Sequence, residues 1–185
     1  ADDDVAAALV KARHQRRMLA EVFRQLKALA AADAATDANL WVMAPMVADQ
    51  HEADYFVKLG KTSGLKFVGA MAEVPSIALM ADKVADVADF VSIGTNDLTQ
   101  YTHAVDRDIS IAERYYRPAS HAMKKLIRMV VEAAREGGIP VTICGSAVGN
   151  PANTLQYLQL GLRSFSVSPQ NLIEVKKALM NAKIK

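Results

Sequence analysis

Cysteine is almost absent from this chain of 185 residues, in which Cys144 is the only one. A single thiol excludes a disulfide within the chain and is typical of the reducing cytoplasm, where we expect this protein. Neither sign of charge is in excess, because 22 basic and 20 acidic residues leave a net charge of +2. That balance argues against a nucleic-acid-binding protein, whose basic face usually shows as a large excess of Lys and Arg.

Long apolar runs are missing as well. The longest ones have the length of a β-strand, so we expect no membrane insertion and see no cleavable leader. About half of the residues, 51%, are hydrophobic, which suits a single domain over residues 1–185 with a real core. The chain begins at Ala1 rather than at a methionine, so we expect it to be a piece of a longer protein.

Apolar, β-prone runs alternate with helical patterns after a leading helix and loop over residues 1–39. Five runs read as strands: Leu40–Val47, Lys66–Val74, Asp89–Ile93, Ile139–Cys144 and Arg163–Val167. Helical patterns lie over residues 5–31, 49–60, 76–87, 119–136, 151–161 and 170–182, and a long loop is expected over 99–118. Alternation of this kind predicts βα units and a parallel sheet. Five units are too few for a closed barrel of eight strands, so the expected α/β fold is the C-terminal part of a (β/α)8 barrel.

Side chains capable of chemistry follow the predicted strand ends. Glu73 follows the second strand, Asn96 and Asp97 follow the third, and Cys144 ends the fourth. Because ligands bind at the carboxyl edge of parallel strands, we expect these side chains to converge there. Two carboxylates with open positions left for substrate suit Mg²⁺. We therefore predict that Glu73 and Asp97 hold this ion.

The remaining polar groups fit an anionic substrate. The Asn96 amide can hold a carboxylate or phosphate oxygen, and the planar guanidinium of Arg107 can grip phosphate with two hydrogen bonds. Cys144 supplies a thiol with an ordinary pKa of about 8.5, suited to proton transfer. An enolate, a phosphoryl group and a proton donor at one site indicate the chemistry that converts phosphoenolpyruvate to pyruvate.

Each of these residues also has a plainer structural interpretation. Glu73 can serve the N-terminus of the next helix, and Asn96 with Asp97 can cap a turn. Arg107 can form a surface ion pair, and Cys144 can be a small core residue. Their coincidence at one edge of one sheet favours the functional interpretation.

Four collinear segments carry a family resemblance. They are Gly69–Pro75 (GAMAEVP), Ser92–Tyr101 (SIGTNDLTQY), Ala104–Arg107 (AVDR) and Cys144–Ser146 (CGS). They resemble the C-terminal, phosphoenolpyruvate-binding domain of enzyme I of the bacterial sugar phosphotransferase system, from about residue 40 to the end. The resemblance implies that Glu73 and Asp97 bind Mg²⁺, that Asn96 and Arg107 hold phosphoenolpyruvate beside Asp97, and that Cys144 protonates the enolate.

The resemblance also implies partners. The phosphoryl group would pass to a histidine on a separate domain and from there to a phosphocarrier protein, and the family barrel forms a homodimer. Exposed strand edges favour a dimer here too. Ser146 departs from the family, which usually has Glu after Cys-Gly, and the phosphoacceptor domain and the first barrel strands are not in this chain. We therefore expect the chain alone not to complete phosphotransfer.

Two other functions stay open at this point. One is a catalytically silent half-barrel that serves dimerisation or regulation, which the change to Ser146 favours. The other is a fragment of pyruvate phosphate dikinase or phosphoenolpyruvate synthase, which keeps the chemistry and changes only the phosphoryl acceptor.

Overall fold

A computed structural model describes residues 21–22, 24–34, 39–106 and 114–182 of the chain. The chain divides into two compact units. One comprises Ala1–Val42 and Lys58–Phe67, and the other comprises Met43–Val57 and Val68–Lys185. Of the residues predicted to form the site, all that the structure describes belong to the second unit.

The described part of the first unit combines a helix with an aromatic pair. Residues 24–34 are helical, and Leu26 on this helix is buried. The Trp41 and Phe67 rings stack with their centroids 4.7 Å apart and their planes 21° apart, a geometry in which aromatic pairs attract. The part of the leading helix predicted before residue 21 lies outside the described residues.

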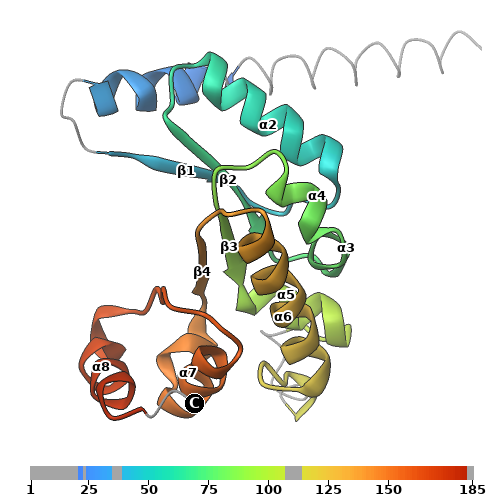
Figure 1. Ribbon diagram of the computed structural model, residues 1–185, viewed down its shortest axis with the longest axis vertical. Helices are drawn as coiled ribbons and strands as arrows, with labels where there is room; N and C mark the ends of the chain where they lie inside the picture. The colour runs from blue at the N-terminus through green and yellow to red at the C-terminus, as the bar shows by residue number, and fades with distance from the viewer. Residues whose placement is uncertain (1–20, 23, 35–38, 107–113, 183–185) are drawn as a thin grey trace, which may run out of the picture. The chain divides into compact units, whose positions relative to one another are not determined.

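One sheet runs through the fold in the order β1 (Trp41–Ala44), β2 (Phe67–Ala72), β3 (Val91–Gly94) and β4 (Val141–Cys144) (Figure 1). β3 pairs in parallel with both β2 and β4, and Gly94 lies opposite Cys144. All four residues of β3 are buried, as expected for a strand covered on both faces. The predicted parallel α/β sheet is confirmed.

Helices follow the strands as the alternation predicts. They are α2 (Gln50–Thr62), α3 (Pro75–Leu79), α4 (Ala81–Ala85), α5 (Thr95–His103), α6 (His121–Glu136), α7 (Pro151–Gln159) and α8 (Leu172–Met180), with the 3₁₀ turns η2 (Ser146–Gly149) and η3 (Pro169–Asn171). α6 packs against α3, α4, β3 and β4, because Ile127 and Val130 on its apolar face are fully buried. Its first turn is capped by Ser120, whose hydroxyl oxygen accepts the Met123 N–H at 3.2 Å.

The prediction of a loop over residues 99–118 is wrong for its first residues, because helix α5 continues to His103. Three threonines within α5 and the Gly-Thr-Asn-Asp sequence at its start give this segment a weak helix propensity. Tertiary packing overrides that weakness, because Leu98 on this helix is fully buried.

Two further elements differ from their predicted form. The helix predicted over 76–87 is two short helices that meet at Met80, whose φ of −112° and ψ of 28° are not helical. The fifth predicted strand, Arg163–Val167, makes a single parallel bridge, between Ile143 and Phe165, in the described part of the chain. Its polar and apolar residues alternate, unlike the continuous apolar runs of strands covered on both faces.

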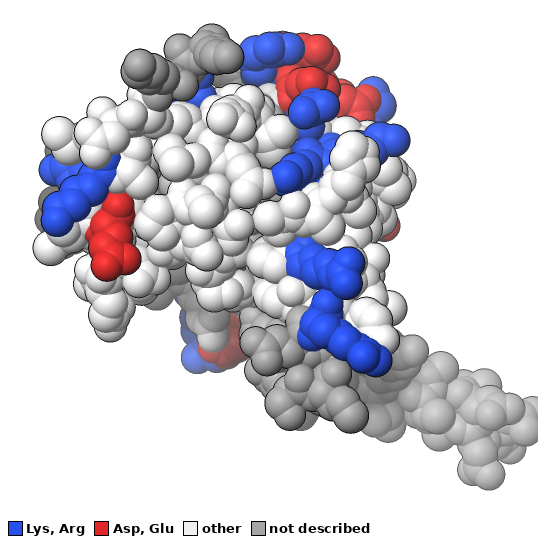
Figure 2. Space-filling model, turned by 90° about the horizontal axis from the view of Figure 1, so that it is seen from below, with Lys and Arg blue, Asp and Glu red and all other residues white. Residues whose placement is uncertain are grey.

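The distribution of charge on the surface agrees with the balanced numbers of basic and acidic residues in the sequence. On the face that Figure 2 shows, basic and acidic side chains lie in scattered groups and most of the surface is uncharged. Within the described residues, no helix combines the length and the apolar character that a membrane span requires.

Candidate active site

Glu73 lies directly after β2 and is held by the ends of two neighbouring strands. Its side chain is buried, with the residue only 4% exposed. Its Oε1 accepts the backbone N–H of Met46, which follows β1, at 2.8 Å. At the end of β3, a Cβ on Gly94 would lie 2.5 Å from Oε2. Only glycine at this position therefore leaves room for the carboxylate.

Asn96 and Asp97 stand in the first turn of α5, immediately after β3. Both are half-buried. A carboxylate at the third position of a helix is stabilised by the partial positive charge of the unpaired N–H groups there. The end of β3 thus delivers an amide and a carboxylate to the edge that Glu73 also occupies.

Cys144 completes the group from the end of β4, opposite Gly94. Partial burial raises the pKa of its thiol, and the charges of Glu73 and Asp97 raise it further. The Ser92 hydroxyl, which donates to Sγ at 3.8 Å, acts in the opposite direction and lowers the pKa. Gly94 packs against Glu73 and lies opposite Cys144, and Asp97 follows in the first turn of α5. Three of the predicted site residues therefore lie at one edge of the sheet.

A set of hydrogen bonds joins the end of β3 to the end of β4. Asn96 Oδ1 accepts two of them, from the backbone N–H and from the hydroxyl of Ser146, each at 2.9 Å. The Thr95 hydroxyl donates to the Cys144 carbonyl oxygen at 2.8 Å. In the sequence, Ser146 is visible only as a departure from the family pattern. Its contact with Asn96 leaves no local signal, because the two residues lie 50 positions apart.

Gly145 permits this close approach of the two strand ends. Its φ of 111° lies in the region that side chains disfavour, and an added Cβ would overlap the Thr95 hydroxyl oxygen. Its neighbours Cys144 and Ser146 can therefore reach α5 only if position 145 has no side chain.

Arg107 lies outside the described residues, so its contact with a phosphate stays a prediction. The donor chemistry of Glu73 and Asp97 fits a hard divalent ion, because Mg²⁺ in proteins is bound by one or two carboxylates and completes its shell with water and substrate oxygens. Among the residues that the structure describes, no group of three or more His, Cys, Asp or Glu side chains forms a larger metal cluster.

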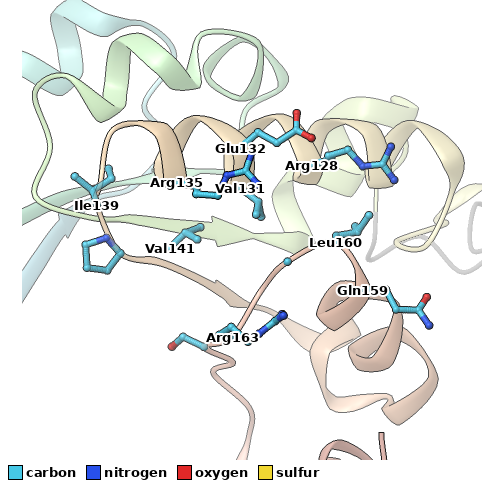
Figure 3. Close-up of a pocket in the computed structure, with 12 residues that line it drawn as sticks. Arg128, Val131, Glu132, Arg135, Ile139, Val141, Gln159, Leu160 and Arg163 are labelled. Carbon is cyan, nitrogen blue, oxygen red and sulfur yellow. The ribbon is translucent and has the colours of Figure 1, made fainter. Parts of the chain in front are cut away.

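A cavity of about 590 Å³ opens at the other end of β4 (Figure 3). Its lining comes from the second half of α6, the start of β4 and the segment after α7, and includes Arg128, Arg135 and Arg163 but none of the predicted site residues. A smaller hollow of about 330 Å³ lies beyond the carboxyl end of β4, and its lining includes Gly145, Ser146 and Asn171. Ligands of parallel sheets bind at the carboxyl edge, which is the edge where this smaller hollow lies, although its lining includes none of the predicted site residues.

Comparison with known proteins gives a match along almost the whole chain. A family model described as "PEP-utilising enzyme, PEP-binding domain" matches residues 11–184. A phosphoenolpyruvate-protein phosphotransferase of Streptomyces coelicolor is 39% identical over 156 residues, which cover 84% of this chain and 28% of the relative. A protein of the same name from Cupriavidus necator is 36% identical over 171 residues, 85% of this chain and 29% of the relative.

A second kind of relative matches at similar identity. A probable phosphoenolpyruvate synthase of Staphylothermus marinus is 39% identical over 147 residues, which cover 75% of this chain and 18% of that protein. The chain thus spans less than a third of the length of each of these relatives.

Solved structures bear on the fold. A citrate lyase from Burkholderia xenovorans superposes with a TM-score of 0.57 at 13% identity, over 75% of this chain and 48% of that one. Citrate synthase SbnG gives a TM-score of 0.52 at 14% identity, over 75% and 60%. Both neighbours have folds of the TIM-barrel type, so the predicted partial barrel is confirmed.

Proposed function

The chain belongs to the family of phosphoenolpyruvate-binding domains of PEP-utilising enzymes, and we propose that it is the substrate-binding part of a Mg²⁺-dependent phosphoenolpyruvate-protein phosphotransferase. In this reaction the phosphoryl group leaves phosphoenolpyruvate for a histidine on another domain of the protein. The enolate that remains takes up a proton at its methylene carbon and departs as pyruvate. A phosphocarrier protein would then receive the phosphoryl group from the histidine.

The observation that carries the proposal is the position of the Cys144 thiol at the same edge of the sheet as Glu73 and Asp97. Partial burial raises the pKa of the Cys144 thiol above its ordinary value, so the thiol keeps its proton at neutral pH. A proton donor needs to be in that state before it acts. Burial also disfavours the thiolate that donation leaves behind, so Cys144 regains a proton readily for the next turnover.

The other residues bind and orient the substrate in this proposal. Glu73 and Asp97 would hold Mg²⁺, which when bound supplies positive charge that offsets the charge of the substrate. Asn96 would donate from Nδ2 to a carboxylate or phosphate oxygen. Arg107 would hold the phosphoryl group with paired N–H donors.

Calorimetry tests the proposal directly. Titration of phosphoenolpyruvate into the chain with Mg²⁺ should give heat of binding that disappears when a chelator removes the ion. Asp97→Asn should weaken binding by more than about tenfold, as loss of an ionic metal ligand does. Asp86→Asn is the matched control, because Asp86 is an exposed carboxylate that ends α4. Absence of heat under all conditions would instead favour a silent half-barrel that serves dimerisation or regulation.

A second candidate keeps the site and changes the phosphoryl acceptor. The similarity to a probable phosphoenolpyruvate synthase favours it, since both kinds of relative match this chain at about equal identity. Labelled phosphoenolpyruvate supplied to the full-length protein distinguishes the two functions. The label should reach a phosphocarrier protein if the first proposal holds, and a small-molecule acceptor if the second does.

A further inference from the structure

We propose that Ser146 is a positioning residue that orients the Asn96 amide toward the substrate. This inference rests on the proposed function and deepens it, because it names the group that decides which end of Asn96 meets phosphoenolpyruvate. It concerns a residue at which this chain carries a hydroxyl of its own rather than the carboxylate usual in the family.

The direction of the hydrogen bonds fixes the orientation of the amide. A backbone N–H can only donate, so the Asn96 atom that faces the Ser146 nitrogen has to be the carbonyl oxygen Oδ1. The Ser146 hydroxyl donates to the same oxygen. With Oδ1 committed to two donors, Nδ2 turns to the other side. Its two N–H groups have no acceptor among the described residues, and they suit an anionic oxygen of the substrate.

The backbone around Ser146 is built for this contact. Gly145, with φ 111° and ψ 169°, turns the chain so that the Ser146 N–H points at α5. The bond from the Thr95 hydroxyl to the Cys144 carbonyl oxygen anchors the residue before it. Asn96 and the proposed proton donor are thereby tied together, although 48 positions separate them in the sequence.

The two bonds can be removed one at a time. Ser146→Ala removes the hydroxyl and keeps the N–H, whereas Ser146→Pro removes both donors. Proline is tolerated here because Ser146 is the first residue of the 3₁₀ turn η2, a position whose N–H is not needed by the turn itself. Ser146→Thr keeps both donors. Ser146 is exposed, so none of these changes disturbs the core.

Nuclear magnetic resonance tests the orientation without any ligand. A scalar coupling through the hydrogen bond should join the Ser146 amide nitrogen to the Asn96 side-chain carbonyl carbon. The Asn96 side-chain amide should be rigid in the wild type and in Ser146→Thr, and mobile in Ser146→Pro. A mobile side-chain amide in the wild type, with no coupling, would overturn the proposal whatever binding shows.

Calorimetry with phosphoenolpyruvate and Mg²⁺ tests the consequence. The dissociation constant should rise about 3- to 10-fold in Ser146→Ala and about 10-fold or more in Ser146→Pro, while Ser146→Thr stays within about twofold. Ser164→Ala is the control, because Ser164 is an exposed serine that lines the larger cavity, and this variant should bind as the wild type does. If the wild type binds and Ser146→Pro binds equally well, the positioning role is wrong and the proposed function stands. If the wild type gives no heat, the proposed function fails and the inference fails with it.

Discussion

The two ends of β4 present opposite chemistry on one strand. At its carboxyl end a thiol lies beside two carboxylates, and hydrogen bonds tie the following turn to α5. At its amino end lies a cavity of about 590 Å³, whose lining includes three guanidinium groups and a single carboxylate (Figure 3). The charged groups of the cavity are Arg128, Glu132, Arg135 and Arg163.

The end of β4 with the larger cavity is therefore not the better candidate for a catalytic site. Arg163 at the cavity donates from Nη1 to the carbonyl oxygens of Leu158 at 3.0 Å and Leu162 at 2.8 Å. Those carbonyls lie at the end of α7 and just after it, where helices leave such groups without partners inside the helix. Arg163 thus serves the local fold, whereas Cys144 at the other end has a pKa raised by burial and by the charges of Glu73 and Asp97.

The largest expected effect compares two glycines, one on each side of β4. Gly145→Ala should lower the free energy of unfolding by about 2–5 kcal/mol, because it adds an overlap with Thr95 to a positive φ. Gly138→Ala should cost only about 1 kcal/mol, since its φ is +68° but an added Cβ meets nothing within 4 Å. Urea unfolding of the two variants measures the difference.

Equal losses in the two variants would mean that the carboxyl end of β4 is no more tightly packed than the amino end. The close approach of Gly145 to α5 would then not constrain the site. The contrast drawn between the two ends would lose its structural basis.

A smaller effect is expected at the cavity. Arg163→Ala removes two hydrogen bonds to backbone carbonyls and should lower the free energy of unfolding by about 1 kcal/mol. Phosphoenolpyruvate binding in the presence of Mg²⁺ should stay unchanged, because Arg163 lies at the far end of β4 from the site. Paired unfolding and calorimetric measurements check both statements. Weaker substrate binding in this variant would move the anion site to the cavity.

The sheet and the carboxyl-edge cluster could be predicted because each depends on local pattern. Apolar runs that end in Glu73, in Asn96 with Asp97 and in Cys144 place these residues at the strand ends, and parallel strands bring such ends to one edge. Helix α5 was missed because its stability comes from burial of Leu98 rather than from helix propensity.

The contact of Ser146 with Asn96 could not be predicted for a different reason. It depends on the φ of Gly145 and on two side-chain conformations set by strands far apart in the sequence. The fifth strand was wrongly predicted for a similar reason, because strand formation depends on partners along the sheet. In the described part of the chain, Phe165 pairs only with Ile143.

The rate of alkylation of the Cys144 thiol compares the effect of a carboxylate at each end of β4. Asp97→Asn should lower the pKa of Cys144, because it removes one of the charges that raise it. Alkylation by iodoacetamide near pH 8 should then be faster than in the wild type, since more of the thiol is ionised. Glu132→Gln, at the cavity end, should leave the rate unchanged. Cys144 is the only cysteine, so the rate reports this site alone.

The smallest effect is the dependence of stability on alkaline pH. Above the ordinary cysteine pKa the unfolded chain loses its thiol proton, while the folded chain keeps it because burial and the nearby carboxylates raise the pKa of Cys144. The folded state then binds more protons, so the free energy of unfolding falls as pH rises through this range. Cys144→Ala should reduce that fall between pH 9 and 10 in urea titrations. A residual slope is expected at higher pH, because burial also raises the pKa of Tyr157. An identical pH dependence in Cys144→Ala and the wild type would show that folding does not raise the pKa of the Cys144 thiol.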